Sequence, residues 1–163
     1  MFKISAGISF RTAALLSVAL LIVSAAGCGT SKGYKGKSDP ATGKQILKAA
    51  KSQMGKKYRS GGISPKTGFD CSGLAYWSHS KNGINIPRES DDQYSSGKKI
   101  SRKNLMPGDL VFFETYRRGA SHVGIYDGKG GFIHSPNSNK SVERTSLNNS
   151  YYKKRYLGAR RYW

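Results

Sequence analysis

Three side chains of this 163-residue sequence could together perform nucleophilic catalysis on an amide: the thiol of Cys71 and the imidazoles of His122 and His134. A thiol nucleophile needs a base that takes up and returns its proton, and a third group that orients the base. In this assignment Cys71 attacks the carbonyl carbon, while His122 pairs with the thiolate and later protonates the leaving amine. His134 fixes the tautomer of His122. These residue types therefore indicate a thiol hydrolase.

The residues around Cys71 predict that it lies on the first turn of a helix. Apolar residues recur at helical spacing from Cys71 to about Asn82, Asp70 is a suitable cap, and Gly83 is a suitable end. Unpaired backbone N–H groups and the positive end of the helix dipole favour an anion at that position. We therefore expect a lowered pKa of the Cys71 thiol, a thiolate near neutral pH, and a backbone N–H that can bind an oxyanion.

Both histidines fall in a predicted β-hairpin. Residues 120–127 alternate between apolar and polar or small residues, as a strand does. A glycine-rich turn follows, and residues 132–135 begin the next strand. Pairing of these two strands places His122 and His134 on the same face, so we expect the two imidazoles to be neighbours.

The remaining segments predict helices first and an antiparallel sheet afterwards. Thr42 and Gln45 have the spacing of a capping box, and an amphipathic helix follows until a glycine ends it. Aromatic and β-branched runs later in the chain favour strands. We expect a single α+β domain over residues 44–163. A flexible linker rich in glycine, serine and lysine is expected before it, over residues 28–43.

Each of the three side chains also has a structural interpretation. A buried cysteine is commonly a small core residue, and a strand histidine is commonly a hydrogen-bonded structural residue. Cys28 and Cys71 could form a disulfide, and one cysteine with two histidines could bind zinc. No two of these residues have the short spacing typical of zinc ligands, so we expect neither a metal nor another cofactor.

Residues 1–27 have the features of a secretory signal. Two basic residues accompany an uncharged, mostly apolar run that ends in small residues directly before Cys28. This arrangement resembles a bacterial lipobox, which implies that Cys28 carries lipid such as palmitate and anchors an exported protein to a bacterial membrane. In a Gram-negative cell we expect the periplasmic face of the outer membrane, because no aspartate follows Cys28. An ordinary cleaved signal and an uncleaved anchor over residues 12–31 are the alternatives.

The chain beyond the signal is strongly basic. Two of the 28 basic residues lie in the first 27 positions and all nine acidic residues come later, so the rest of the chain carries a formal charge of +17. Such a charge suits an anionic partner, such as nucleic acid, anionic lipid or an anionic cell wall, and equally suits a solvated surface. No nucleic-acid-binding motif is present, so we expect no nucleic-acid partner.

Four ordered motifs between about Ile46 and Trp163 resemble those of the NlpC/p60 cysteine peptidases. They are Phe69-Asp70-Cys71-Ser72-Gly73, Leu105-Met106-Pro107-Gly108-Asp109-Leu110-Val111-Phe112-Phe113, Ser121-His122-Val123-Gly124-Ile125-Tyr126 and Phe132-Ile133-His134-Ser135. The lipobox adds a similarity to the small lipoprotein members that remodel bacterial cell walls.

The resemblance implies a papain-like α+β fold and hydrolysis of peptidoglycan stem peptides. It gives Cys71, His122 and His134 the roles of nucleophile, base and orienting residue. It also implies residues that bind the stem peptide: Tyr58, Asp70, Ser72 and Arg88. We expect a monomer that has peptidoglycan and, through the lipid at Cys28, the membrane as its partners.

The resemblance leaves the bond that is cleaved open. Candidates are the bond after γ-D-glutamate, to diaminopimelate or lysine, and the D,D cross-link between stems. Ser60 stands where many family members carry an aromatic residue, and Asp91 and Asp92 make the segment after Arg88 acidic. We expect all three near the cleft, where they bear on substrate preference.

Two other functions are compatible with the same residues. One is a catalytically inactive lipoprotein that binds the wall, and the other is a thiol amidase or acyltransferase. In either case the basic surface would attract anionic wall polymers or lipid.

Overall fold

The computed structural model describes residues 38–163. The predicted signal over residues 1–27, the predicted lipidation site Cys28 and most of the predicted linker lie outside the described residues. No helix among residues 38–163 has the length and apolar composition needed to cross a membrane.

The first helix, α1 (Pro40–Lys51), begins earlier than the sequence predicts. The carboxylate of Asp39 accepts hydrogen bonds from the backbone N–H groups of Ala41 and Thr42, at 3.0 and 3.1 Å. The prediction that Thr42 is the cap is therefore wrong, and residues 40–43 are helix instead of flexible linker. The physical reason is that an aspartate cap followed by proline at the first helical position leaves no unpaired proline N–H and presets the backbone angle.

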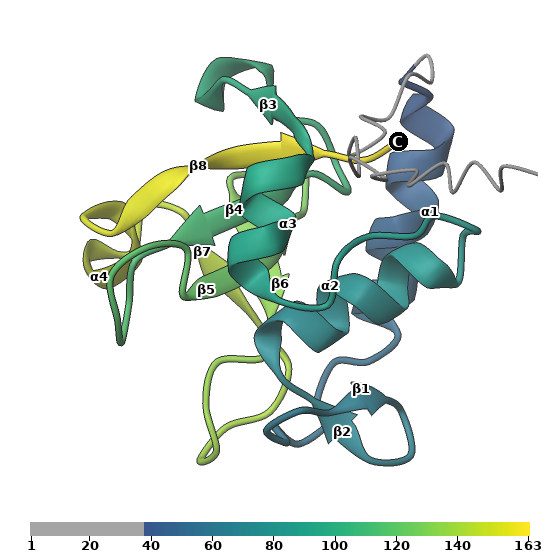
Figure 1. Ribbon diagram of the computed structural model, residues 1–163, viewed down its shortest axis with the longest axis vertical. Coiled ribbons are helices and arrows are strands. Elements are labelled where there is room, and N and C mark those ends of the chain that lie inside the picture. The colour runs from purple at the N-terminus through teal and green to yellow at the C-terminus, as the bar shows by residue number, and fades with distance from the viewer. Residues whose placement is uncertain (1–37) are drawn as a thin grey trace, which may run out of the picture. The chain divides into compact units, whose positions relative to one another are not determined.

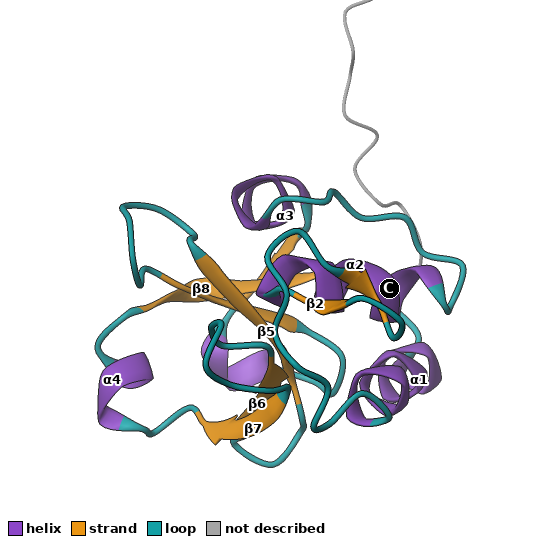
Figure 2. Ribbon diagram, turned by 90° about the horizontal axis from the view of Figure 1, so that it is seen from below, coloured by secondary structure: helices purple, strands orange, loops and turns teal. Residues whose placement is uncertain are grey.

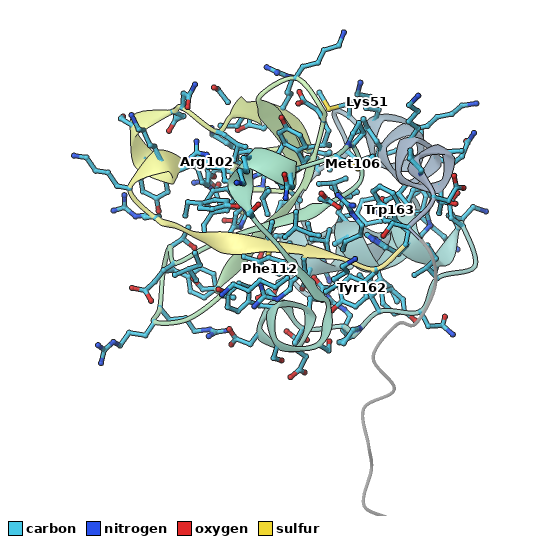
Figure 3. All side chains as sticks on the ribbon, turned by 90° about the horizontal axis from the view of Figure 1, so that it is seen from above. Lys51, Arg102, Met106, Phe112, Tyr162 and Trp163 are labelled. Carbon is cyan, nitrogen blue, oxygen red and sulfur yellow. The ribbon has the colours of Figure 1, made fainter. Side chains whose placement is uncertain are left out.

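Gly43 explains how the end of the chain packs on α1. A side-chain carbon at this position would collide with the indole of Trp163 and with the carbonyl oxygen of Pro107. The C-terminus lies beside α1 (Figure 1), and Figure 3 shows Trp163 on the same side of the molecule as this helix. Trp163 is fully buried. A glycine that the sequence assigns to a linker is thus part of the core contact.

The described residues contain three further α-helices and a small β-hairpin outside the central sheet. A hairpin of β1 (Ile63–Ser64) and β2 (Gly68–Phe69), which the sequence analysis did not predict, leads into α2 (Cys71–Ser80). Asp70 caps α2 as predicted, since its side chain accepts from the backbone N–H of Gly73 at 2.6 Å. The short helices are α3 (Ser90–Ser96) and α4 (Ser150–Lys153), and η1 (Arg102–Asn104) is a single 3₁₀ turn.

Six antiparallel strands form the central sheet in the order β3-β8-β4-β5-β6-β7. In chain order they are β3 (Lys98–Ile100), β4 (Leu110–Phe113), β5 (His122–Tyr126), β6 (Gly131–His134), β7 (Glu143–Ser146) and β8 (Tyr156–Arg161). The predicted hairpin is confirmed, since β5 and β6 pair with Tyr126 opposite Phe132. The edge strands β3 and β7 were not predicted, because neither has an apolar alternation over its three or four residues.

Apolar side chains cover both faces of the sheet. One layer packs α1 and α2 against strand residues such as Phe112, Val123 and Ile125. The other layer joins Val111, Phe113 and Phe132 and is closed by aromatic residues that include Tyr152 of α4. Figure 2 shows α1 and α2 on one side of the strands and α4 on the other. The predicted α+β fold is therefore confirmed, and the strands carrying the histidines are buried on both faces.

The proline-glycine turn before β4 has a structural role. Asp109 is fully buried and forms two hydrogen bonds of 2.7 Å with the guanidinium of Arg161 on β8. It also accepts from the backbone N–H of Met106 at 2.8 Å. This ion pair joins the turn to the C-terminal strand β8. In the sheet, β4 separates β8 from β5 and β6, the strands that carry the histidines.

Candidate active site

The cleft that contains Cys71 also contains most of the residues that the sequence predicts. It has a volume of about 320 Å³. Both Cys71, at the start of α2, and His122, at the start of β5, line it. Four further predicted residues line the same cleft: Tyr58, Asp70, Ser72 and Arg88. The structure thus brings together six of the seven predicted site residues in one cavity, and the seventh, His134, lies directly behind His122.

Close backbone contacts position Cys71. A side-chain carbon on Gly73 would collide with the carbonyl oxygen of Gly62, so the start of α2 lies directly on the hairpin that precedes it. This close backbone approach occurs at Gly62, the second residue of the glycine pair Gly61 and Gly62. From the other side, the hydroxyl of Ser135 donates to the carbonyl of Phe69 at 2.7 Å. Because Ser135 follows His134, this bond joins the histidine hairpin to the segment that leads into Cys71.

The two imidazoles are hydrogen-bonded neighbours, as the sequence predicts. Nε2 of His122 lies 2.8 Å from Nδ1 of His134, and the rings are nearly perpendicular, at 84°. The hairpin register explains the contact, because His134 lies diagonally across from His122 on the same face. The other nitrogen of His134, Nε2, lies 2.9 Å from the hydroxyl of Thr145 on β7.

One set of tautomers in this chain of contacts fits the role proposed for His122. If His122 is to take a proton through Nδ1, its Nε2 must carry hydrogen and donate to Nδ1 of His134. His134 then carries its own hydrogen on Nε2 and donates to Oγ1 of Thr145. Every ring nitrogen that faces away from the cleft therefore has a partner, and Nδ1 of His122 is left as the base.

The electrostatics of Cys71 differ from the expectation. Burial raises the pKa of its thiol to about 11, and the negative charge of Asp70 also raises it. Hydrogen bonds from three backbone N–H groups, those of Val123, Ser72 and Cys71, lower the pKa, but by less than burial raises it. The predicted thiolate near neutral pH is thus wrong for the unliganded protein. The helix terminus favours an anion, but removing the sulfur from water opposes it more strongly.

The histidines are uncharged for the same reason. Burial lowers the pKa of His122 to about 4 and that of His134 to about 2, and the neighbouring His122 also lowers the latter. Both directions disfavour a preformed thiolate–imidazolium pair in the unliganded protein. We therefore expect proton transfer from Cys71 to His122 to accompany the attack.

Asp70, Ser72 and Arg88 form one network at the mouth of the cleft. The guanidinium of Arg88 donates to the Asp70 carboxylate at 2.5 Å and to the Ser72 hydroxyl at 2.7 Å. The Asp70 carboxylate also accepts from the backbone N–H of Gly61 at 2.9 Å. Asp70 therefore holds the helix start, the glycine pair and Arg88 together, in addition to facing the cavity.

Tyr58 lies in the cleft close enough to be affected by the nucleophile. The pKa of its hydroxyl is raised, first by burial and then by the charges of Cys71 and Asp70. Its backbone N–H donates to the carbonyl of Lys140 at 3.0 Å, which attaches the loop after β6 to this side of the cleft.

Three residues are expected near the cleft because they differ from the family pattern or make it acidic: Ser60, Asp91 and Asp92. One of them lines the cleft. Ser60 lines it, as predicted. Asp91 and Asp92 do not line it, but they directly follow Glu89 and Ser90, which do, so they lie near the cleft as expected. Asp91 forms an ion pair of 2.6 Å with Arg117 in the loop between β4 and β5.

The sequence analysis missed two residues that contact the histidine pair. The hydroxyl of Thr145 is hydrogen-bonded to Nε2 of His134. The ring of Tyr152 packs against His122 and His134, with ring centroids 5.8 and 5.2 Å apart. Tyr152 comes from α4, a helix of four residues, and Thr145 from an edge strand without apolar alternation. No pattern in the sequence marks either element.

Among residues 38–163, no three His, Cys, Asp or Glu side chains are grouped so as to hold a metal ion. Three of the four histidine nitrogens of the site are hydrogen-bonded within the protein: Nε2 of His122 and both ring nitrogens of His134.

Comparisons with known proteins agree with the geometry. The family model described as "NlpC/P60 family" matches residues 55–161. The chain is 46% identical over 132 residues to murein DD-endopeptidase MepH of Escherichia coli (strain K12), covering 78% of this chain and 48% of the relative. It is 41% identical over 128 residues to gamma-DL-glutamyl hydrolase of Bacillus subtilis (strain 168), covering 77% of this chain and 31% of the relative.

A solved structure of similar fold is that of a family protein from Bacillus cereus ATCC 10987. It superposes with a TM-score of 0.69 at 38% sequence identity, and the match covers 74% of this chain and 40% of that one. The chain spans about half, or less, of the length of the curated relatives named above.

Proposed function

Because the chain belongs to the NlpC/P60 family, we propose that it is a cysteine endopeptidase that hydrolyses the stem peptides of peptidoglycan or their cross-links. One observation carries the proposal: Cys71, on the first turn of α2, and His122, which is hydrogen-bonded to His134, line the same cleft. The relatives' names, a murein DD-endopeptidase and a gamma-DL-glutamyl hydrolase, support this substrate class.

In the first half of the reaction, the sulfur of Cys71 attacks the carbonyl carbon of the scissile amide. Its proton passes to Nδ1 of His122 as the C–S bond forms. The backbone N–H of Cys71, at the helix start, is the donor we assign to the oxyanion. The tetrahedral intermediate then breaks the C–N bond, His122 returns the proton to the leaving amine, and a thioester remains on Cys71.

In the second half, water replaces the amine. His122 takes a proton from the water as its oxygen attacks the thioester carbon. The C–S bond breaks, the sulfur recovers a proton, and the acyl fragment leaves as a carboxylic acid. His134 and Thr145 keep Nδ1 of His122 available as the base through both halves, because the hydrogen of His122 stays on Nε2.

The acyl side of the substrate is assigned to the cleft that contains Asp70, Ser72 and Arg88. Arg88 offers a guanidinium to a substrate carboxylate, and Glu89 and Asp70 offer carboxylates to a substrate ammonium group. Stem peptides carry groups of both kinds. Tyr58 lines the same cleft, and burial raises the pKa of its hydroxyl.

The cellular setting that we propose depends on residues outside the described part of the chain. The apolar run before Cys28 supports export, and the lipobox-like residues support lipid attachment at Cys28 and anchoring to a bacterial membrane. The domain would then act as a monomer on peptidoglycan close to that membrane.

Digestion of purified sacculi tests the proposed function. The full chain is incubated with sacculi, and the soluble fragments are weighed by mass spectrometry. We expect fragments whose masses correspond to hydrolysis of an amide within stems or between them, and the masses identify the bond. Fragments cut only between sugars, or no release beyond that of heat-inactivated protein, would contradict the proposal.

A further inference from the structure

A second cavity, with a volume of about 470 Å³, lies next to the nucleophile cleft. The two cavities share Tyr116, His122 and Pro136, and Cys71 lines only the first. His122 therefore forms part of the boundary between them. A cavity of this volume lies within the range that small ligands occupy in proteins. Of the residues that line it, the mechanism described above uses only His122 and Thr145.

The proposed chemistry indicates which part of the substrate belongs on this side. His122 delivers its proton to the leaving amine, so the amine must lie on the side of the imidazole. The acyl portion lies with Cys71, Asp70 and Arg88. The second cavity is then on the leaving-group side of the scissile bond. This step rests on the proposed function.

The charges in the second cavity indicate what the leaving residue carries. Among the described residues that line it, Lys140 is the only lysine or arginine, and Glu143 is the only acid. Nζ of Lys140 lies 3.2 Å from Oε1 of Glu143. Their side chains are 54% and 37% exposed, so a ligand in the cavity can reach both of them. The rest of the wall supplies aromatic rings and amides, among them Tyr151, Tyr152 and Asn149.

The backbone holds Lys140 in place although its side chain is exposed. The backbone N–H of Lys140 donates to the carbonyl of Asn137 at 3.0 Å, and its carbonyl accepts from the N–H of Tyr58 at 3.0 Å. Tyr58 lines the nucleophile cleft. The base of the Lys140 side chain is therefore fixed relative to the reacting centre, while its ammonium group lies at the exposed end, paired with Glu143, where a ligand can reach it.

We propose that this second cavity binds diaminopimelate on the leaving-group side, and that Lys140 pairs with its free carboxylate. When the bond after γ-D-glutamate is cut, a lysine in the same place has no such carboxylate and would bring its own ammonium group towards Lys140. For that bond the cavity therefore favours diaminopimelate over lysine. Where the stem is not cross-linked, Glu143 is placed to accept the free ammonium group of the diaminopimelate.

The test uses two peptidoglycan fragments that differ in one group. In one, the free carboxylate of diaminopimelate is intact, and in the other it is a primary amide of nearly the same shape. We expect the full chain to cut the carboxylate form with a kcat/KM about fivefold higher, which is typical of a partly exposed ion pair. The difference should appear in KM, because the pair forms on binding and does not change during reaction.

Substitutions of lysine test whether Lys140 causes this difference. In Lys140→Gln the ratio of kcat/KM for the carboxylate fragment to that for the amide fragment should fall to about one, and in Lys140→Arg it should stay near that of the parent. Lys44→Gln is the matched control, because Lys44 is an exposed lysine of α1 that lines neither cavity. Equal cleavage of the two fragments by the parent protein would overturn the inference, and so would a preference that survives Lys140→Gln. Failure to cut either fragment would overturn the proposed function instead, so the two failures are distinguishable.

Discussion

The hydroxyl of Thr145 lies 2.9 Å from Nε2 of His134, on the side of the imidazole opposite His122. This contact ends a chain of hydrogen bonds that begins at the catalytic base and crosses three strands of the sheet. When Nδ1 of His122 is free to take a proton from Cys71, Nε2 of His134 carries hydrogen and donates to this hydroxyl, so the contact supports the tautomers that the reaction needs.

Removal of the Thr145 hydroxyl should slow the reaction without weakening substrate binding. In Thr145→Val, the Nε2–H group of fully buried His134 has no acceptor in the tautomer that the reaction needs, which raises the free energy of that tautomer by about 1–3 kcal/mol. We expect kcat to fall about tenfold or more with KM little changed. Glu143 does not replace the hydroxyl without moving, because its carboxylate lies 3.8 Å from the same nitrogen.

Thr145→Ser is the control for this prediction, since it keeps the hydroxyl and removes only a methyl group. It should restore most of kcat. If the valine and serine variants have equal kcat, or if valine changes KM alone, Thr145 does not position the histidine pair.

The rate of thiol alkylation should rise with pH and show no plateau near neutrality. Burial raises the pKa of Cys71 to about 11, so the thiolate fraction increases about tenfold per pH unit through the neutral range. The measurement is the rate of iodoacetamide labelling between pH 5 and 9, with Cys71→Ala to subtract reaction at Cys28. A plateau below pH 7 would mean that a thiolate–imidazolium pair already exists in the free protein.

Acid should destabilise the fold well above the pKa of its carboxylates. Burial lowers the pKa values of His79 and His122 to about 4. The unfolded chain binds protons at these residues near pH 6.5, and the folded chain does not until about pH 4, so stability is lost as the pH falls through that window. Each histidine should contribute on the order of 3 kcal/mol of this loss.

His79→Gln isolates one of these groups. His79 is fully buried, with Nδ1 2.8 Å from the carbonyl of Ala75, and glutamine keeps a donor for that carbonyl. Denaturant unfolding at several pH values should show a shallower loss of stability between pH 6.5 and 4 than in the parent. An unchanged slope would show that His79 is not among the groups responsible.

The contact between Gly73 and Gly62 should be essential for the position of Cys71. In Gly73→Ala the added carbon meets the carbonyl oxygen of Gly62, so either the hairpin or the helix must shift. We expect a loss of about 3 kcal/mol in the free energy of unfolding, as for overpacked sites, and a lower kcat. Ser80→Ala, at the exposed end of the same helix, should change stability by less than about 0.5 kcal/mol. Similar stabilities for the two variants would contradict the contact.

The part of the site that could be predicted from the sequence is the part carried by regular elements. Asp70 and Cys71 follow helix-start rules, and the alternation around His122 predicts a strand whose hairpin partner bears His134. Local patterns of this kind do not depend on the rest of the fold. The same holds for the α+β class, which follows from the order of helical and strand-like segments.

The remainder depends on contacts between segments far apart in the chain. Thr145 reaches His134 because β7 pairs with β6, and the polar residues of β7 give no strand signal. The raised pKa of Cys71 depends on how deeply the packed hairpins bury it, which helix-start chemistry does not reveal. The helix start at Pro40 was misassigned because two capping patterns, at Asp39 and Thr42, overlap in the sequence.

The measurement that tests the central claim most directly compares Cys71→Ala with the parent protein on purified peptidoglycan fragments of known mass. Both proteins are first shown to unfold at the same temperature, so that a loss of activity reflects the missing sulfur. The parent should release the hydrolysed fragment, and Cys71→Ala should release none above the uncatalysed background. Cleavage by Cys71→Ala at a rate near that of the parent would contradict the assignment of Cys71 as the nucleophile.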